Sequence, residues 1–240
     1  MSGEIDGLFE TLRVDHGEAL DVAAHLDRLF AGLPRTGIAL PESRGELAET
    51  IAKAAARAPR PVARLRLTVS RGPTVRVTTE PYSPPSEEDY RDGVPILLLT
   101  DLRIGSNSPL AGLKSLPWEP NRQALRRAEA AGAFEALLLN ERGRLAEGAR
   151  SNLVLALPDG LFTPPESDGC LPGTIRRRLL EGGWIAERSL TPDDLQRARE
   201  TVLLNSLIGA LAVKGRKDED SVADWLRKKI ARSPLNEAVR

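Results

Sequence analysis

The chain has 240 residues and a mass of 26.1 kDa, which is enough for one large domain or two small ones around a sizeable core. Its 34 Lys and Arg residues balance its 34 Asp and Glu residues, which argues against a general nucleic-acid binder, and its one cysteine and two histidines argue against a disulfide framework or a zinc centre. No apolar run is long enough for a membrane helix and the N-terminus is acidic, so we expect a cytoplasmic protein.

In the first part of the chain, alternating and helical patterns of apolar residues predict strands and helices in turn. Asp15-His16-Gly17 is a hairpin signal between two short strands, and Gly32 and Pro34 end the next helix. The predicted elements are a strand pair over 9–20, helices over 21–32 and 42–56, paired strands over 62–72 and 73–80, and a buried strand over 94–104. Residues 81–93 are rich in proline and acidic side chains and predict a linker or an excursion.

The second part of the chain begins with a predicted loop over 106–121, which we expect to cross between two domains. After it the patterns predict a helix over 121–133, hairpins over 134–148 and 151–165, a helix that opens after Gly173 in the stretch 171–183, and a capped helix over 191–200. A buried strand and turn over 201–213 and an amphipathic helix around Trp225 follow. This order indicates an α/β (α+β) fold with a small N-terminal domain, residues 1–105, and a larger C-terminal domain, residues 106–240.

Lys114 lies in a loop among Leu110, Leu113 and Leu116. An apolar surround disfavours the ammonium form of a lysine, and only the neutral amine forms a Schiff base with a carbonyl compound. Taken alone, a lysine in a loop is more often a solvated surface group.

Three further motifs are ambiguous when each is taken alone. Glu147 ends a strand ahead of a glycine-bearing turn. A buried carboxylate there suits a pyridine nitrogen, although a plain strand-end glutamate followed by a turn is the more common case. Gly173 and Thr174 open a helix, which suits a phosphate, although a Pro-Gly turn followed by a helix is common. Arg28 either reaches a phosphate or is solvated.

The order of these motifs along the chain carries more information than any one of them. FETLRV, AAHLDRLFAGL, LRLTVSRG, LAGLKSL, LAEGARSNLVL with LFTPP, and LPGTIRRRLLE succeed one another between about residues 6 and 213. In this order the chain resembles the class IV aminotransferase-like enzymes. That family includes branched-chain and D-amino-acid aminotransferases and 4-amino-4-deoxychorismate lyase, and its members depend on pyridoxal 5′-phosphate (PLP).

The resemblance implies a role for each of the singled-out residues. Lys114 matches the catalytic lysine that binds PLP covalently and moves protons at the substrate, and Glu147 matches the glutamate that pairs with the pyridine nitrogen. Arg28 matches the arginine that binds the cofactor phosphate. Donors to that phosphate are implied at Ser151, Asn152, Gly173, Thr174 and Ile175. The resemblance also implies a PLP site in a cleft between the two domains and a homodimer with a small-molecule substrate.

Two stretches favour the lyase within this family. NSPLAGLKSL resembles the lyase segment around its lysine, and Asn205, Ser206, Leu207 and Gly209 match an Asn-Ser-Leu-x-Gly string of the lyase. The lyase releases pyruvate from 4-amino-4-deoxychorismate and leaves 4-aminobenzoate, a folate precursor. The alternatives are an aminotransferase that acts on branched-chain or D-amino acids with 2-oxoglutarate, a degenerate non-catalytic relative, and an α/β protein whose Lys114 and Glu147 are surface groups.

The sequence departs from the family pattern in several places. The chain starts almost on the FET motif, so the expected sheet lacks N-terminal strands. Trp118 or Pro117 lies where many transaminases have a tyrosine. Ala149 and Ile175 replace hydroxyl residues, each costing about 1 kcal/mol of cofactor affinity. Candidates to bind a substrate carboxylate are Arg64, Arg66, Arg71 and Arg103, each of which is equally well explained as a solvated charge.

Overall fold

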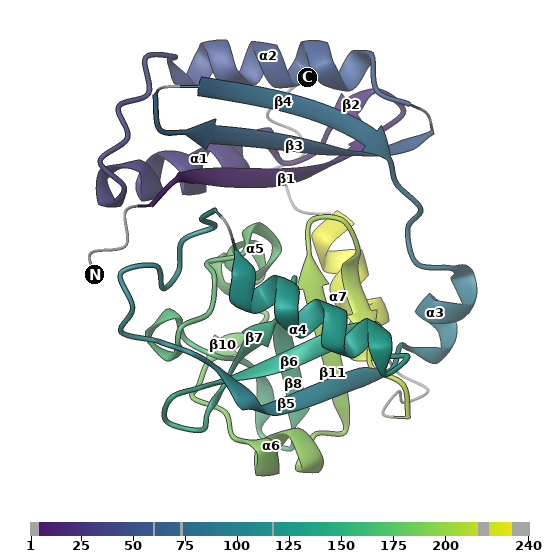
Figure 1. The fold of residues 1–240 in the computed structure, drawn as a ribbon. Coiled ribbons are helices and arrows are strands. Elements are labelled where there is room, and N and C mark those ends of the chain that lie inside the picture. The colour runs from purple at the N-terminus through teal and green to yellow at the C-terminus, as the bar shows by residue number, and fades with distance from the viewer. Residues whose placement is uncertain (1–4, 60, 73, 117, 216–220, 232–240) are drawn as a thin grey trace. The chain divides into compact units, whose positions relative to one another are not determined.

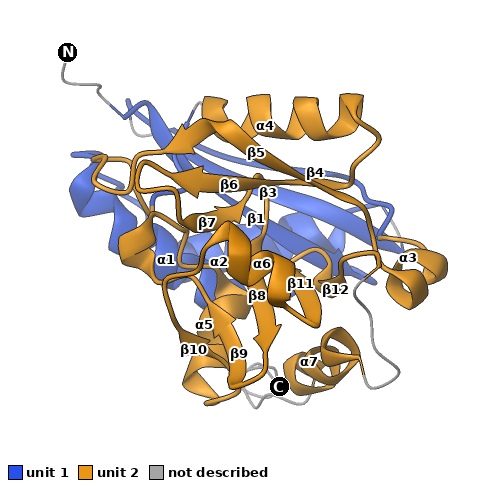
Figure 2. Ribbon diagram, turned by 90° about the horizontal axis from the view of Figure 1, so that it is seen from below, with its two compact units in different colours: residues 1–84, 113–118, 235–240 blue, residues 85–112, 119–234 orange. Residues whose placement is uncertain are grey.

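The computed structural model describes residues 5–59, 61–72, 74–116, 118–215 and 221–231. These residues form two compact units (Figure 2). Of the described residues, unit 1 holds those up to 84 together with 113–118, and unit 2 holds those in 85–112 and 119–231. The segment that contains Lys114 therefore belongs to unit 1. Compact units need not coincide with domains, so the domains 1–105 and 106–240 stay a prediction.

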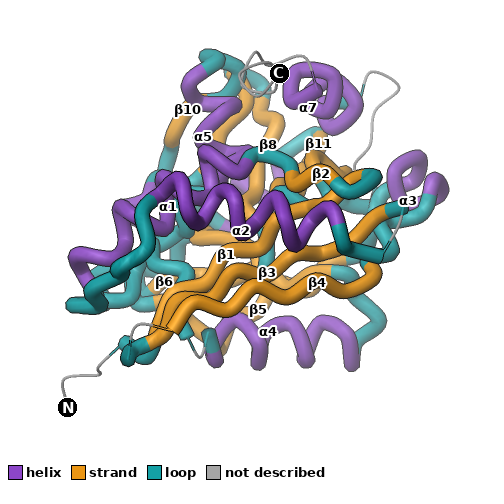
Figure 3. Tube along the Cα trace, turned by 90° about the horizontal axis from the view of Figure 1, so that it is seen from above, coloured by secondary structure: helices purple, strands orange, loops and turns teal. Residues whose placement is uncertain are grey.

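Unit 1 is a four-stranded antiparallel sheet with helices on one face (Figures 1 and 3). Its strands are β1 (Gly7–Asp15), β2 (Glu18–Ala19), β3 (Val62–Ser70) and β4 (Thr74–Pro81), in the order β2-β1-β3-β4. Its helices are α1 (Val22–Gly32), the 3₁₀ turn η1 (Leu33–Arg35) and α2 (Arg44–Ala56). The period-2 pattern of β1 and β3 puts leucine and valine on the face that α1 and α2 cover, and this layer is the core of the unit.

The β1–β2 turn shows why the sequence signal for this hairpin was reliable. His16 (φ 49°) and Gly17 (φ 89°) both have left-handed backbone conformations, which match the twist of a two-residue hairpin turn. Helix α2 begins at Arg44, two residues later than predicted, because Ser43 and Glu46 form a capping box at its start.

Unit 2 contains two sheets with buried central strands. The three-stranded sheet has the order β5-β6-β7 and the five-stranded sheet has the order β10-β9-β8-β11-β12. The strands are β5 (Ile96–Ile104), β6 (Glu135–Asn140), β7 (Leu145–Gly148), β8 (Asn152–Leu157), β9 (Gly160–Thr163), β10 (Ala186–Glu187), β11 (Glu200–Asn205) and β12 (Gly209–Ala212). The helices are α3 (Glu87–Asp92), α4 (Glu119–Ala130), the 3₁₀ turn η2 (Glu166–Asp168), α5 (Thr174–Glu181), α6 (Pro192–Arg197) and α7 (Val222–Ala231).

Most predicted elements of unit 2 are confirmed, including the hairpins β6–β7 and β8–β9 and the amphipathic helix around Trp225. The linker prediction for residues 81–93 is wrong in part, because Ser86 and Asp89 form a capping box that starts the short helix α3. Strand β10 was not predicted, because its two residues pair with β9 only through the tertiary fold. Within the described ranges, no helix combines the length and the apolar character needed to cross a membrane.

Candidate active site

Lys114 lies on a stretch of unit 1 that runs antiparallel beside the first half of β1. The N–H of Phe9 donates to the carbonyl of Lys114 (2.9 Å), and the N–H of Leu116 donates to the carbonyl of Gly7 (2.8 Å). Leu113, the preceding residue, is buried in the core of unit 1. Backbone bonds and a core anchor therefore hold the lysine at a defined place along β1.

The Lys114 side chain lies against two aromatic rings. Its Nζ is 4.7 Å from the centroid of the Phe9 ring and 5.0 Å from that of Trp118, and the two rings meet edge to face with centroids 5.7 Å apart. Trp118 is thus a neighbour of the amine, and it is one of the two residues predicted to lie where many transaminases have a tyrosine. The other, Pro117, lies outside the described residues. The rings limit the directions from which solvent reaches the amine.

Arg66 joins Lys114 on this side of the sheet. Arg66 is paired with Thr11 across the β1–β3 ladder, so it shares a face with Phe9, two residues before Thr11. Its guanidinium carbon lies 3.8 Å from the centroid of the Phe9 ring. A lysine amine and a guanidinium therefore both lie at the ring of Phe9.

Arg28 is held by a buried carboxylate that the sequence interpretation missed. Arg28 donates from Nε to Oε1 of Glu10 (2.8 Å) and from a terminal nitrogen to Oε2 (2.5 Å), which is a two-point ion pair. Nδ1 of His25 lies 2.7 Å from Oε2 of Glu10, and because an ionised carboxylate only accepts, Nδ1 is the donor. Both Glu10 and His25 are about 1% exposed.

Burial alone would raise the pKa of Glu10. The charge of Arg28 and the hydrogen bonds from Arg28 and His25 outweigh burial and lower the pKa of Glu10 to about 2. Burial also lowers the pKa of His25, which favours the neutral ring. An ionised Glu10 therefore fixes the direction of the Arg28 side chain. The sequence contained a signal for this buried carboxylate, because Glu10 interrupts the apolar face of β1 formed by Leu8, Leu12 and Val14.

Glu147 lies on β7 in unit 2 and is 5% exposed. Nδ2 of Asn121, on α4, donates to its Oε1 (3.2 Å), and the N–H of Leu171 donates to its Oε2 (2.8 Å). Both of these donors are neutral groups, and together they orient the carboxylate. Asn121 was not singled out in the sequence, because nothing local marks a helix residue that reaches a strand 26 positions away.

The segment after η2 connects Glu147 to the start of α5. Nδ2 of Asn152 donates to the carbonyl of Leu171 (2.9 Å), whose N–H binds Glu147. A Cβ built on Gly173 would lie 1.9 Å from Oδ1 of Asn152, so only glycine fits at this approach. Asn152 and Gly173, both predicted as phosphate-binding residues, thus shape the same short turn.

Helix α5 begins without a side-chain cap. Its N-cap is Gly173, and no side chain accepts from the first turn, whereas Ser43, Ser86 and Thr191 cap the helices α2, α3 and α6. Among the described residues none accepts a hydrogen bond from the N–H of Thr174 or Ile175. Free N–H groups at a helix N-terminus favour an anion such as phosphate.

The hydroxyl of Ser151 is directed at a buried carboxylate. Its Oγ donates to Oε2 of Glu135 (2.8 Å), which is buried, so that hydroxyl hydrogen is directed at a carboxylate. Burial raises the pKa of Glu135, opposed in part by Arg150. In this arrangement Ser151 has its backbone N–H, rather than its hydroxyl hydrogen, to offer a phosphate.

In unit 2 the predicted residues come together as a linked group, whereas in unit 1 they share a strand. Lys114 is bonded to Phe9 and Arg28 to Glu10, neighbouring residues of β1 whose side chains point to opposite faces of the sheet. In unit 2, Leu171 links Glu147 to Asn152, which packs against Gly173 at the start of α5. PLP requires an amine, a carboxylate for its ring nitrogen, and cations and N–H donors for its phosphate. The uncapped helix start and the glycine approach at Gly173 fit the phosphate end of that cofactor.

Comparison with known proteins identifies the family of the chain. The family model described as "Amino-transferase class IV" matches residues 7–215. A bifunctional aminodeoxychorismate lyase / D-amino acid transaminase of Mycobacterium tuberculosis is 33% identical over 206 residues, which cover 73% of this chain and 68% of that protein. An aminodeoxychorismate lyase of Vibrio harveyi is 27% identical over 248 residues, covering 95% of this chain and 89% of that protein.

The fold also matches that of a solved structure. A hypothetical aminotransferase from Mycobacterium tuberculosis, in a form bound to α-ketoglutarate and PMP, aligns with a TM-score of 0.82 and 26% identity over 100% of this chain and 94% of that chain. The predicted fold class is confirmed by this likeness and by the family match. The chain belongs to the class IV aminotransferases, a family of enzymes whose cofactor is PLP.

Proposed function

We propose that this protein is a PLP-dependent lyase that releases pyruvate from 4-amino-4-deoxychorismate and leaves 4-aminobenzoate. The observation that supports the lyase over other family activities is the β11–β12 turn with the sequence Asn205-Ser206-Leu207-Ile208-Gly209. Oδ1 of Asn205 accepts from the N–H groups of Leu207 (2.9 Å) and Ile208 (3.0 Å), and its Nδ2 donates to the carbonyl of Arg150 (3.2 Å).

Asn205 therefore ties the lyase-like turn to Arg150, which directly precedes two of the proposed cofactor residues, Ser151 and the first residue of β8, Asn152. Tyr90 adds a second tie, because its hydroxyl donates to the carbonyl of Ile208 (2.9 Å). A turn held at both ends has a fixed shape, and the N–H and carbonyl groups of a fixed turn can recognise one substrate geometry.

In this proposal the chain's own residues hold the cofactor at three places. Lys114 binds it covalently, Glu147 pairs with the ring nitrogen, and Arg28 with the N–H groups of Thr174 and Ile175 binds the phosphate. When bound, PLP supplies an electron sink that lowers the cost of removing a proton from the substrate carbon next to nitrogen. Lys114 takes up and delivers protons at that carbon as the general base and acid.

The substrate carries carboxylates, and Arg66 is the arginine that we propose for one of them. It lies at the Phe9 ring beside Lys114. The other three candidates have partners away from that ring: Arg64 pairs with Glu80, Arg71 donates to the carbonyl of Thr36 (3.5 Å) and Arg103 to that of Asn140 (3.5 Å). We therefore expect Arg66→Ala to raise KM for the carboxylate substrate more than it lowers kcat.

The alternative is an aminotransferase that acts on a branched-chain or D-amino acid with 2-oxoglutarate. It is favoured by the bifunctional relative, whose name includes both activities. The deciding experiment incubates purified protein and PLP with 4-amino-4-deoxychorismate alone, and with amino acids plus 2-oxoglutarate. Pyruvate release without an amino acceptor supports the lyase. Glutamate formation in the second mixture with no pyruvate released in the first overturns it, and protein that stays colourless with PLP supports a non-catalytic relative.

Homodimerisation and a cytoplasmic location remain part of this proposal. Family resemblance supports the dimer, in which a partner loop completes each site. Light scattering of the PLP-loaded protein tests it: a mass near twice 26.1 kDa supports the dimer and a monomer mass rejects it.

A further inference from the structure

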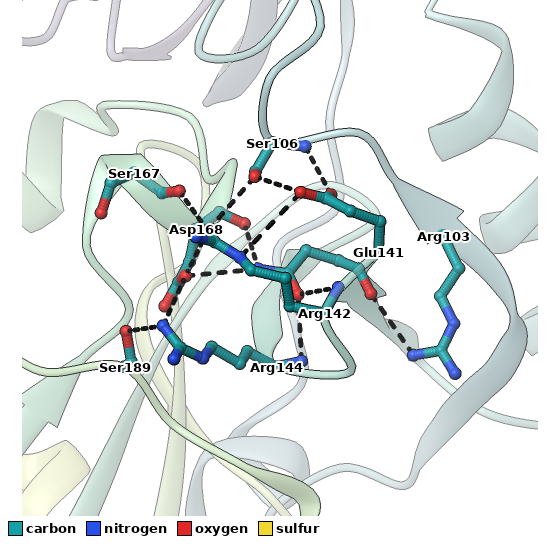
Figure 4. Close-up of polar contacts among 9 residues, drawn as sticks. Arg103, Ser106, Glu141, Arg142, Arg144, Ser167, Asp168 and Ser189 are labelled. Carbon is teal, nitrogen blue, oxygen red and sulfur yellow. Dashed lines mark hydrogen bonds and ion pairs between the residues drawn. The ribbon is translucent and has the colours of Figure 1, made fainter.

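One side-chain cluster in unit 2 contributes no group to the proposed cofactor contacts. It is centred on the turn between β6 and β7, the hairpin that also carries Glu147 (Figure 4). We define the turn clamp as Glu141 and Arg142 of this turn with their partners Ser106, Ser167 and Asp168.

The clamp first fixes Ser106. Oε2 of Glu141 accepts from the N–H of Ser106 (2.8 Å), and Oε1 accepts from its hydroxyl (2.6 Å). These two bonds lower the pKa of Glu141 to about 2, so the carboxylate is ionised at neutral pH. Ser106 lies two residues after the end of β5 and eight residues before Lys114. The clamp therefore holds the chain on its way to the lysine.

The clamp also fixes the turn η2. A terminal nitrogen of Arg142 donates to the carbonyl of Ser167 (2.6 Å), to Oδ1 of Asp168 (2.8 Å) and to the hydroxyl of Ser106 (3.2 Å). Gly169 comes next with φ 98°, and a Cβ built on it would lie 3.2 Å from Cα of Ser106. The two segments are thus bridged by Arg142 and packed backbone to backbone.

Asp168 is the buried end of the clamp and is 1% exposed. Besides its bond from Arg142, Oδ1 of Asp168 accepts a hydrogen bond from Nδ2 of Asn140 (3.3 Å). A terminal nitrogen of Arg144 lies 3.6 Å from the same oxygen. Its Oδ2 is buried without a hydrogen-bond partner among the described residues. The buried end of the clamp is therefore held through Oδ1 by charged and neutral donors from the β6–β7 hairpin.

The residues after η2 lead directly to the candidate site, so the position of η2 affects that site. Three residues after Asp168, the N–H of Leu171 binds Glu147, and two residues later Gly173 begins α5. The hairpin that carries Glu147 therefore contacts, through its turn, the segment that leads to the phosphate-binding helix.

We propose that Glu141 and Arg142 are positioning residues that fix η2, and with it the segment leading to α5, in register with Glu147, so that the carboxylate and the phosphate-binding helix start form one preorganised part of the cofactor site. This inference rests on the proposed PLP roles of Lys114, Glu147 and α5. A displacement of about 1 Å of Glu147 or of the start of α5 weakens cofactor binding, because the contacts to the ring nitrogen and to the phosphate must be made together.

The test compares Arg142→Ala, Arg142→Lys and Ser106→Ala with the wild type. The measurements are the Kd for PLP of the apo-protein, the rate at which PLP becomes fixed by borohydride, and the Tm of the apo-protein. The matched control is Arg188→Ala, because Arg188 pairs with Asp159 (2.7 Å) at the turn of the other hairpin, β8–β9. We expect Arg142→Ala and Ser106→Ala to raise the Kd and slow the fixation about tenfold or more, Arg142→Lys to restore part of both, and the control to change neither.

Each outcome decides between the proposals. If Arg142→Ala and Ser106→Ala keep the Kd for PLP and the fixation rate within about twofold of wild type, the clamp proposal is wrong. It is also wrong if PLP binding weakens only in proportion to the fall in Tm and Arg142→Lys does not restore it. If Arg142→Ala does not fold, Ser106→Ala and Arg142→Lys carry the same test. A wild-type protein that fixes no PLP overturns the proposed function instead, so the two failures are distinguishable.

Discussion

Glu10 occupies a face of β1 that otherwise carries leucine and valine, and its ion pair with Arg28 is the reason it is tolerated there. Replacing Glu10 with Gln keeps the shape but leaves the Arg28 charge without its two-point partner. We expect Glu10→Gln to weaken PLP binding about tenfold or more and to lower the free energy of unfolding by on the order of 3 kcal/mol.

Titration of the apo-protein with PLP and urea unfolding measure these two effects. Glu80→Gln is the matched control, because Glu80 makes an exposed ion pair with Arg64 on the same sheet. It should bind PLP and unfold much as the wild type does. If Glu10→Gln behaves like Glu80→Gln, Glu10 does not position Arg28.

The lowered pKa of Glu10 also predicts a dependence of stability on pH. Its pKa falls from 4.5 to about 2 on folding, so the ionised group stabilises the folded protein fully above pH 4.5. That stabilisation is lost as the pH falls through 4.5 towards 2. The difference in unfolding free energy between wild type and Glu10→Gln should therefore shrink from about pH 6 to about pH 3 in urea titrations. A difference that is constant over this range would contradict the assignment.

Helix α5 is the element whose start depends most on a single glycine. A Cβ at position 173 would meet Oδ1 of Asn152 at 1.9 Å, so Gly173→Ala must displace either Asn152 or the helix start. We expect this variant to be destabilised by about 1–3 kcal/mol and to bind both PLP and inorganic phosphate more weakly.

The control for that substitution is Gly45→Ala. Gly45 lies in the first turn of α2, where a Cβ would meet only Oγ of Ser43 at 4.0 Å. It should be neutral or stabilised by up to about 1 kcal/mol, because alanine favours the helix. Thermal unfolding and a PLP titration distinguish the two variants, and equal behaviour would show that the approach of Asn152 to Gly173 is unimportant.

The sequence predicted elements best where a local pattern decides them. Strict alternation in β3 and the Asp15-His16-Gly17 turn are local, and both are confirmed. The short helix α3 was missed because the proline and acidic residues around it favoured a linker, although Ser86 and Asp89 form a capping box there. Strand β10 depends on a pairing that only the fold creates.

For the candidate site, the family resemblance supplied the residues and the structure supplied their supports. Lys114 and Glu147 were identified because they stand in ordered motifs. Asn121 and the Arg142 contacts join positions far apart in the sequence, and no local pattern marks them. Glu10 was predictable in principle, since a carboxylate on an apolar strand face requires a buried partner.

At the scale of the whole molecule, PLP should act as a stabilising ligand. A ligand that binds only the folded state adds about 2.7 kcal/mol at 100 times its Kd. We expect PLP to raise the Tm of the apo-protein, and pyridoxal, which lacks the phosphate, to raise it less. Equal shifts from the two compounds would show that Arg28 and α5 do not bind the phosphate.

The covalent bond at Lys114 is the claim on which the function depends. The most direct measurement is borohydride reduction of the PLP-loaded protein followed by peptide mass spectrometry, with Lys114→Ala in parallel. We predict one reduced PLP group, located on the peptide that contains Lys114, and none in the variant. PLP fixed on a different lysine, or equal labelling of the variant, would contradict the account.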